Sequence, residues 1–237
     1  GQLRFHGQWI KPMHEGGLRC ELLLRLKDAG GELHTASHFM EAAERFHIAR
    51  TVDRWVIEHA LRQIREFERK DSRVEAWHIN LSGQSVDCET PLPELIERIR
   101  DSGVPPHKLC FEITESAAIA NLEEVGRFVD LLHDLGCRVA IDDFGAGFSS
   151  FRNLRQLKID FVKIDGSFVR NLADSPHDQV FVKALTELAR SFGVKVIAEW
   201  VQDEETVTLL AGWGVDCIQG ALIGTARDRP ETATTAA

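Results

Sequence analysis

The sequence predicts an α/β barrel of the TIM type, in which eight strands alternate with helices and close into a cylinder. Three observations favour this fold. The chain has 237 residues, the length of one large domain. Short apolar runs alternate along it with longer segments that have the 3.6-residue period of a helix. This alternation is typical of parallel strands joined by right-handed crossovers. An open, doubly wound sheet is the alternative fold.

Each predicted strand is a run rich in apolar and β-branched residues. In chain order the runs cover residues 2–9, 18–26, 74–81, 108–114, 137–142, 159–164, 194–199 and 215–219. The link between the first two runs is too short to hold a helix. We therefore expect the first two strands to be antiparallel and the barrel to be irregular at that point.

The predicted helices rest on apolar periodicity and on residues that begin or end helices. Ser37 is the candidate N-cap of the first helix. Glycines 136, 193 and 214 stand where helices commonly end. The predicted helices cover residues 39–48, 52–67, 93–99, 122–135, 178–192 and 204–213. The folded domain is expected to span residues 1–224, with 225–237 as a flexible tail.

Composition excludes several classes of function. The chain has 28 Lys and Arg against 37 Asp and Glu, a net charge of −9, which disfavours binding to DNA or RNA polymers and to anionic membranes. No apolar run approaches the roughly 20 residues of a membrane-spanning helix. The five cysteines form no C-x-x-C pair, and Cys20, Cys110, Cys137 and Cys217 lie in apolar strand-like runs. We expect these four to be buried thiols in a reducing compartment, the cytoplasm.

Polar side chains interrupt the apolar strands, most of them at or near the C-terminal ends. In a TIM barrel those ends form the mouth that holds the active site. A carboxylate within an apolar strand is unfavourable unless it is paired or bound to a metal. We therefore expect one cluster at the mouth, made of Glu21, Asn80, Glu112, Asp142, Asp143, Lys163, Glu199 and Gln219.

This set of ligands is typical of a hard divalent cation such as Mg²⁺ or Mn²⁺, since no His or Cys stands at a strand end with metal-site spacing. Adjacent Asp142 and Asp143 would allow one carboxylate to bridge two metals. Such pairs of metals clamp the attacking and leaving oxygens of an in-line displacement at phosphorus. Lys163 can offset the developing charge or orient the attacking water.

Two short motifs in residues 142–147 point elsewhere but are weak. The letters D-F-G occur in protein kinases, yet no H-R-D loop precedes them here. The letters G-A-G begin a nucleotide-binding glycine motif but lack its third glycine. Two glycines beside paired aspartates instead indicate a mobile active-site loop.

Seven short motifs occur in the order in which one known family carries them. They are E-L-L-L-R from Glu21, I-N-L-S from Ile79, F-E-I-T-E-S from Phe111, D-D-F-G-A-G from Asp142, V-K-I-D from Val162, A-E from Ala198 and I-Q-G from Ile218. Over residues 3–223 the chain resembles the EAL-domain cyclic di-GMP phosphodiesterases. A lone E-x-L would be uninformative, but seven collinear motifs are specific.

The resemblance implies an EAL-type barrel that hydrolyses cyclic di-GMP to linear pGpG with two Mg²⁺ or Mn²⁺ ions. It implies that the first metal is held by Glu21, Asn80, Glu112 and Asp142. Asp142 would be shared with a second metal, which Asp143 and Glu199 would also bind. Lys163 and Gln219 would lie beside the attacking water.

The resemblance also implies residues around the metals and partners of the chain. Arg25 would contact a substrate phosphate, and Gln8 and Asp165 would lie on the substrate side, with Asp165 also supporting the metal ligands. Glu115 would anchor the loop of residues 143–150. The resemblance further implies that the chain forms a homodimer and that it belongs to a longer parent chain with sensory or diguanylate-cyclase domains.

The chain departs from the family pattern at three places. The residues after Glu199 usually read G-V-E, but here they are Trp200, Val201 and Gln202. Gln8 is followed by Trp9 in place of proline, and residues 221–224 replace an aromatic-rich segment. These changes leave every implied metal ligand in place, but bear on metal affinity and on placement of the guanine bases.

Three other functions compete with the phosphodiesterase. One is a catalytically impaired EAL domain that senses cyclic di-GMP without cleaving it. Another is a barrel enzyme of the enolase type, with Mg²⁺ and a lysine base, which does not account for the D-D-F-G loop or for Asn80. The third is a purely structural or protein-binding role.

Overall fold

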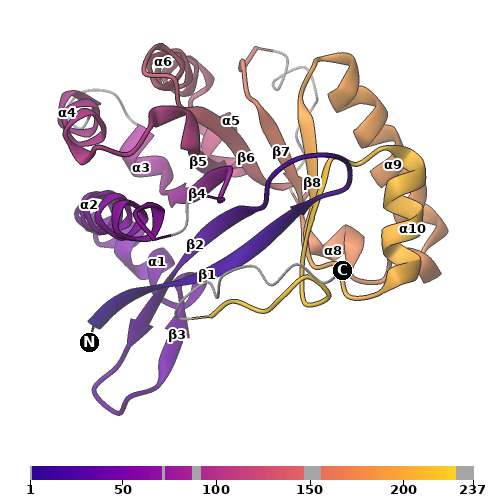
Figure 1. Ribbon diagram of the computed structural model, residues 1–237, viewed down its shortest axis with the longest axis horizontal. Helices are drawn as coiled ribbons and strands as arrows, with labels where there is room; N and C mark the ends of the chain where they lie inside the picture. The colour runs from indigo at the N-terminus through magenta and orange to yellow at the C-terminus, as the bar shows by residue number, and fades with distance from the viewer. Residues whose placement is uncertain (1, 71–72, 87–91, 147–155, 228–237) are drawn as a thin grey trace.

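The computed structural model describes residues 2–70, 73–86, 92–146 and 156–227. Eight strands form a closed barrel, because β1 pairs with both β2 and β9 (Figure 1). The predicted TIM-type fold is therefore confirmed, and an open sheet is excluded. The barrel strands are β1 (Gln2–Pro12), β2 (Arg19–Lys27), β4 (Ala76–Leu81), β5 (Leu109–Thr114), β6 (Arg138–Phe144), β7 (Phe161–Ile164), β8 (Lys195–Ala198) and β9 (Cys217–Gln219).

Strand β1 runs antiparallel to both of its neighbours, β2 and β9. The antiparallel pairing with β2 was predicted from the short link between the two strands. Its register places Gln8 opposite Glu21 of β2 and Ile10 opposite Gln219 of β9. The other neighbouring strands of the barrel pair in parallel. Strand β1 therefore closes the barrel and carries Gln8 between two strands that contribute to the mouth.

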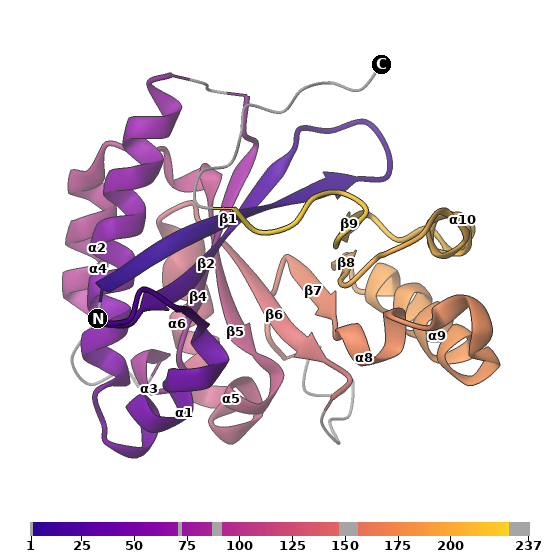
Figure 2. The same cartoon turned by 90° about the horizontal axis from the view of Figure 1, so that it is seen from below.

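Helices cover the outside of the barrel, with α2, α4 and α6 on one side and α9 and α10 on the other (Figure 2). All six predicted helices are present. Their bounds are α1 (Ala36–Arg45), α2 (Ala49–Glu68), α4 (Leu92–Ser102), α6 (Leu122–Asp134), α9 (Pro176–Ser191) and α10 (Glu204–Trp213). The predicted C-terminal glycines at 136, 193 and 214 are confirmed, because each has φ between 73° and 88°.

The prediction for the first helix was wrong in its bounds and in its cap. Helix α1 begins at Ala36, after an extended Thr35, so Ser37 is inside the first turn and is not the N-cap. The helix ends at Arg45 because His47 adopts a left-handed backbone with φ of 57°. One short strand and three short helices were not predicted: β3 (Leu33–Thr35), α3 (Gly83–Val86), α5 (Glu115–Ala120) and α8 (Gly166–Val169).

The buried apolar side chains form two layers. The larger cluster includes the residues between the strands and the surrounding helices. The smaller one fills the inside of the barrel with Ile10, Cys110, Ala140, Phe161, Ile197 and Cys217. As predicted, the described cysteines are buried free thiols; Cys88 lies outside the described residues. The inner cluster forms an apolar floor below the polar mouth.

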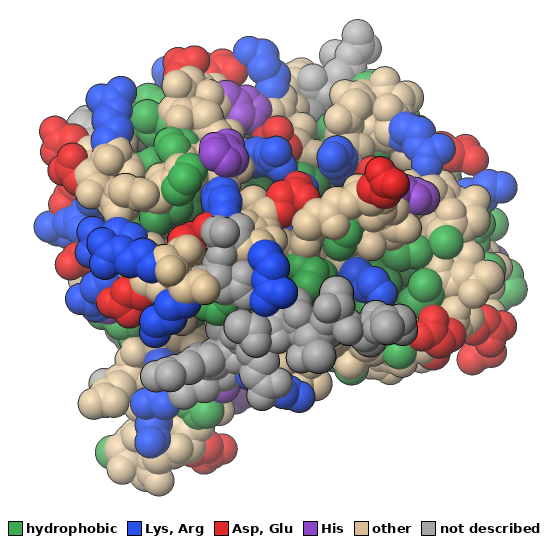
Figure 3. Space-filling view, viewed as in Figure 1, with side chains coloured by type: hydrophobic (Ala, Val, Ile, Leu, Met, Phe, Trp, Pro, Cys, Tyr) green, Lys and Arg blue, Asp and Glu red, His purple; other side chains and the backbone are tan. Residues whose placement is uncertain are grey.

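The ends of the chain and its surface complete the fold. Arg227 pairs with Gly7 of β1 through two backbone hydrogen bonds, and residues 228–237 of the predicted tail lie outside the described range. Acidic and basic side chains are interspersed on the face shown in Figure 3. Within the described ranges, none of the helices combines the length and the apolar character that crossing a membrane requires.

Candidate active site at the mouth of the barrel

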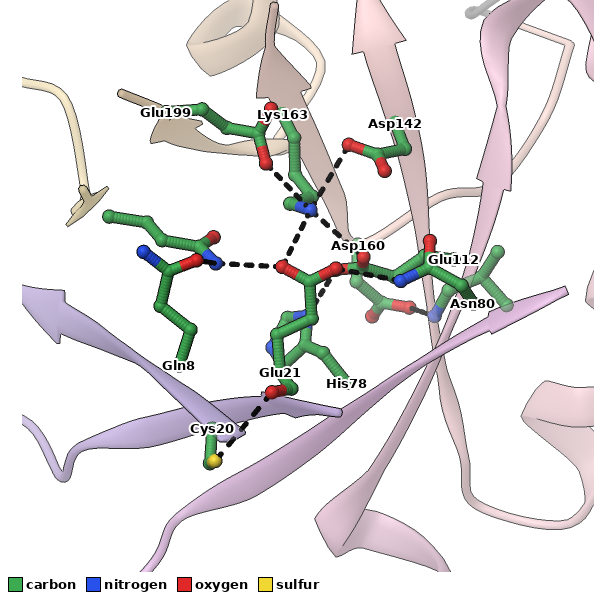
Figure 4. Close-up of polar contacts among 12 residues, drawn as sticks. Gln8, Cys20, Glu21, His78, Asn80, Glu112, Asp142, Asp160, Lys163 and Glu199 are labelled. Atoms are coloured by element: carbon green, nitrogen blue, oxygen red, sulfur yellow. Dashed lines mark hydrogen bonds and ion pairs between the residues drawn. The ribbon is translucent and has the colours of Figure 1, made fainter. Parts of the chain in front are cut away.

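The structure brings all the predicted mouth residues together. Glu21, Asn80 and Glu112 lie on neighbouring strands β2, β4 and β5. Asn80 is directly opposite Glu112, and Glu21 is opposite the residue two positions before Asn80. The remaining members lie on or directly after strands β6 to β9: Asp142, Asp143, Lys163, Glu199 and Gln219. Figure 4 shows the side chains of Asp142 and Glu199 turned toward Lys163. Parallel strands place their C-terminal ends at the same edge, which explains the convergence.

Lys163 is the centre of the cluster and is completely buried. Its ammonium nitrogen Nζ lies 3.2 Å from Glu21 Oε2, 2.9 Å from Glu112 Oε2, 3.1 Å from Asp142 Oδ1 and 2.8 Å from Glu199 Oε1. One ammonium thus faces four carboxylates, which leaves the cluster with excess negative charge whenever the carboxyl groups are ionised.

Side-chain amides fix the position of Glu21. Asn80 Nδ2 donates to Glu21 Oε1 at 2.6 Å, and Gln219 Nε2 donates to Glu21 Oε2 at 2.7 Å. The same Gln219 group also donates to Gln8 Oε1 at 3.2 Å, while Gln8 Nε2 donates to the carbonyl of Gly224 at 3.1 Å. Gln8 is therefore part of the network around Glu21, as a contribution of the antiparallel strand.

The carboxylates form two groups that could each hold a metal ion. Glu21, Glu112 and Asp142 offer oxygens within 4.8 Å of one another, and so do Asp142, Asp143 and Glu199. Asp142 belongs to both groups. Its buried Oδ1 lies 3.1 Å from Lys163 Nζ as an ion pair and has no other partner among the described residues. An all-oxygen donor set with excess negative charge fits a hard divalent cation.

Burial and mutual repulsion shift the pKa values of the carboxyl groups. Desolvation raises the pKa of Glu199 to about 8 and, together with the charge of Asp142, that of Asp143 to about 6. Burial also raises the pKa of Glu112 well above its usual value. Glu21 differs: burial opposes its ionisation, but Lys163 and two donated hydrogen bonds lower its pKa to about 2.

These shifts predict a pH-dependent stability of the metal-free protein. In the unfolded chain Asp143 and Glu199 titrate near pH 4, so between about pH 4 and 8 the folded state binds more protons than the unfolded state. The free energy of unfolding then falls as pH rises. We expect the Tm in EDTA to fall by about 5 °C between about pH 6.5 and 8. Below this window the opposite contribution of His78, whose pKa burial lowers to about 3, reduces the slope. Glu21 adds no slope, because its folded and unfolded pKa values both lie below this window.

Scanning calorimetry at several pH values measures this slope. Saturating Mn²⁺ at the highest pH should restore the Tm, because an ion that binds only the folded state stabilises it. Glu199→Gln should flatten the dependence. A Tm that is constant or rises over this range would contradict the expectation.

The residues predicted around the metals lie at the periphery of the cluster. Arg25 is on the same strand as Glu21, half-buried, and its Nη1 donates to the carbonyl of Leu24 at 3.0 Å. Asp165 caps helix α8 by accepting a hydrogen bond from the amide of Ser167 at 2.9 Å. Within the described ranges, neither side chain makes a hydrogen bond to the mouth residues.

Glu115 lies where the predicted loop begins. Its Oε2 accepts a hydrogen bond from the backbone amide of Gly145 at 2.9 Å, directly after the stretch that includes Asp142 and Asp143. Residues 147–150 of the loop lie outside the described range. Asp143 itself has a left-handed backbone with φ of 53°, a strained conformation of the kind that often occurs at functional sites.

Trp200, which replaces the family glycine, also has a left-handed backbone, with φ of 55°. Its indole is turned onto helix α8: a Cβ added to Gly166 would meet Trp200 Cδ1 at 2.1 Å. The guanidinium of Arg170 lies 4.4 Å above the ring, and 51% of the residue is exposed. The indole thus packs at the rim of the mouth, and Gln202 beside it is exposed.

Two buried residues near the site were missed by the sequence analysis. Asp53 of α2 accepts hydrogen bonds from the amide and hydroxyl of Ser82 and from the hydroxyl of Ser85, which fixes the chain after Asn80. His78 lies below the mouth with Nδ1 2.6 Å from an oxygen of Glu112. A lone polar residue within a helix or an apolar strand carries no signal of its distant partner.

Curated proteins similar to this chain include two whose names state an activity. The chain is 37% identical over 210 residues to "Cyclic di-GMP phosphodiesterase PdeF" of Escherichia coli K12, and the match covers 88% of this chain and 28% of that protein. It is 36% identical over 211 residues to "Cyclic di-GMP phosphodiesterase PdeB" of Shewanella oneidensis MR-1, covering 87% and 24%. The chain thus spans about a quarter of the length of these relatives.

Solved structures resemble the fold over almost its whole length. The "PaMucR Phosphodiesterase, c-di-GMP complex" has a TM-score of 0.87 and 28% identity, covering 95% of this chain and 92% of that one. The FimX EAL domain from Pseudomonas aeruginosa bound to c-di-GMP has a TM-score of 0.88 and 27% identity, covering 96% and 91%. The family model described as "EAL domain" matches residues 5–226. Because that match extends from within β1 to beyond β9, the chain belongs to the EAL domain family.

Proposed function

We propose that the chain is a metal-dependent phosphodiesterase that hydrolyses cyclic di-GMP to linear pGpG. The observation that carries the proposal is the pair of acidic groups that share Asp142 around a buried lysine. The names of the relatives and the ligands of the similar structures support the same substrate. Two Mg²⁺ or Mn²⁺ ions bound there would lower the pKa of a bound water, so that it becomes a better nucleophile, and would neutralise charge on the phosphate.

The residues of the mouth divide into two sets of ligands. Glu21, Asn80, Glu112 and Asp142 would hold one ion. Asp142, Asp143 and Glu199 would hold the other. The hydrogen bonds from Asn80 and Gln219 keep the carboxylate of Glu21 in one orientation, and hydrogen bonds that orient metal ligands in this way typically strengthen metal binding.

The other residues of the site would act on the substrate. The ammonium of Lys163 would stabilise negative charge on the phosphoryl oxygens as it develops, and Gln219 would orient the attacking water. Arg25 would bind a substrate phosphate, with Gln8 and Asp165 on the same side. Glu115 would hold the start of the loop after Asp143 through the amide of Gly145.

A sensor that binds cyclic di-GMP without cleaving it is the second candidate. The observation in its favour is the pair of departures at the rim, Trp200 and Gln202, beside Glu199. A carboxamide in place of a carboxylate weakens the local attraction for a divalent cation. The retention of all the carboxylates and of Lys163 favours the enzyme.

A nucleotide assay distinguishes the two functions. The chain is incubated with cyclic di-GMP and either Mg²⁺ or Mn²⁺, and the products are separated by chromatography. An enzyme gives pGpG with metal and none after addition of EDTA. If calorimetry detects binding of cyclic di-GMP but neither metal gives pGpG, the sensor is the correct function.

We also propose that the EAL domain covers residues 1–224, that it forms a homodimer, and that it belongs to a longer parent protein with sensory or diguanylate-cyclase domains. The small share of each curated relative that the chain covers, 28% and 24%, supports the longer parent. Light scattering at high protein concentration tests the dimer, and a monomer would refute that part alone.

A further inference from the structure

His78 is a buried histidine whose ring has one hydrogen-bonding partner in the part of the chain that the structure describes. It stands on β4 two residues before Asn80, so both side chains point to the same face of the strand, the inside of the barrel. The residue has no exposed surface. Its Nδ1 lies 2.6 Å from Glu112 Oε1 (Figure 4), and its buried Nε2 has no hydrogen-bond partner among the described residues.

The ring of His78 is enclosed by the apolar floor of the barrel. It lies edge-on to the ring of Phe161, with 5.8 Å between the ring centroids, and the strand register places it opposite Cys110 of β5. Both neighbours belong to the inner apolar cluster. A polar ring in such surroundings is unfavourable unless its polar atoms form hydrogen bonds. The hydrogen bond with Glu112 therefore accounts for a histidine at this position.

The two oxygens of Glu112 have different partners. Oε1 is held by His78, whereas Oε2 accepts from Lys163 Nζ at 2.9 Å. Lys163 is shared among four carboxylates, so it attracts Glu112 without favouring one orientation of the group. Of the described carboxylates, His78 hydrogen-bonds to this one alone, from below, and thereby fixes the plane of Glu112 relative to the mouth.

The tautomer of His78 follows from its surroundings. A neutral imidazole has one N–H, and the hydrogen bond that it makes decides which nitrogen carries the proton. With the proton on Nδ1, the imidazole donates to the carboxylate, and a bare acceptor is left at Nε2. The other tautomer would bury an unpaired N–H and place a lone pair against the carboxylate, which is the less favourable arrangement.

We propose that His78 is a positioning residue for the metal site: its Nδ1–H donates to Glu112 Oε1 and orients the carboxylate toward a divalent cation at the mouth. The inference rests on the proposed function, because the cation is the metal of that site. Partners of this kind typically change metal affinity by about 10–100-fold when they are removed.

Two variants separate the hydrogen bond from the packing. His78→Leu keeps most of the volume and removes the donor, whereas His78→Asn places an amide N–H near the position of Nδ1 but loses the ring. Binding of Mn²⁺ to each protein, without nucleotide, is measured by electron paramagnetic resonance of the free ion. We expect His78→Leu to bind Mn²⁺ about 10–100-fold more weakly and His78→Asn to remain within about threefold of the unmutated chain.

The outcomes distinguish this inference from the proposed function. If the unmutated chain binds no Mn²⁺, the metal site itself fails. If it binds Mn²⁺ and His78→Leu binds equally well, or if His78→Asn loses as much as His78→Leu, the positioning role is overturned. Circular dichroism checks folding, and His78→Met replaces the leucine variant if that protein does not fold.

Discussion

Glu21→Gln is expected to abolish the hydrolysis of cyclic di-GMP, with a loss of at least about 10⁴-fold in turnover. Glu21 accepts hydrogen bonds from Asn80, Gln219 and Lys163 and belongs to the first acidic group. The substitution keeps the volume of the side chain but removes its charge. It also places an amide N–H where these donors point, so both the metal ligand and its orientation are lost. Product chromatography at saturating Mn²⁺ measures the loss.

The matched control is Glu66→Gln on the outer face of α2, where Glu66 is exposed. This change removes the same charge far from the mouth and should leave turnover within about twofold, as surface substitutions usually do. Mn²⁺ binding should fall in Glu21→Gln alone. Retention of more than a few per cent of activity in Glu21→Gln would show that Glu21 is not an essential ligand.

Lys163→Met is expected to lower turnover by about 10²–10³-fold, while the dissociation constant for cyclic di-GMP changes by no more than several-fold. Charge on the phosphoryl oxygens builds up in the transition state, so an ammonium that acts there affects the rate more than substrate binding. Methionine fills nearly the same buried space without a charge. Single-turnover kinetics measures the rate, and the dependence of that rate on protein concentration gives the apparent dissociation constant.

Lys158→Met is the control for Lys163→Met, since Lys158 lies on the surface and pairs with Asp130. It should leave both the rate and the binding unchanged. A large loss of cyclic di-GMP binding in Lys163→Met, with the rate of bound substrate preserved, would make Lys163 a substrate-binding group and contradict the proposed role.

The barrel could be predicted from the sequence because its strands are strongly apolar. In residues 108–114 and 159–164 a buried strand leaves a mainly apolar pattern, and the structure places β5 and β7 inside these ranges. The mouth could be predicted for a related reason. A carboxylate such as Glu112 stands out within an apolar strand, and the fold dictates where the strand ends converge.

The elements that were missed lack such patterns. Helices α3 and α8 have four residues each, about one turn, so no period can be read from them. His78 and Glu112 lie 34 residues apart in sequence, and nothing local links them. The left-handed backbone at Trp200 could not be predicted either, because an indole at that position gives no indication of positive φ.

The closure of the barrel by β1 has a consequence for how the protein folds. Ile10 pairs with Gln219, so the seam joins the beginning of the chain to its last strand, one of the most non-local contacts that a chain can make. Loop-closure entropy delays such contacts until the intervening segments are ordered. During synthesis β1 can pair with β2 early, but its other edge stays open until β9 has emerged. The network of Gln8, Glu21 and Gln219 would therefore form late, and a nascent chain would expose an unpaired strand edge until β9 has been synthesised.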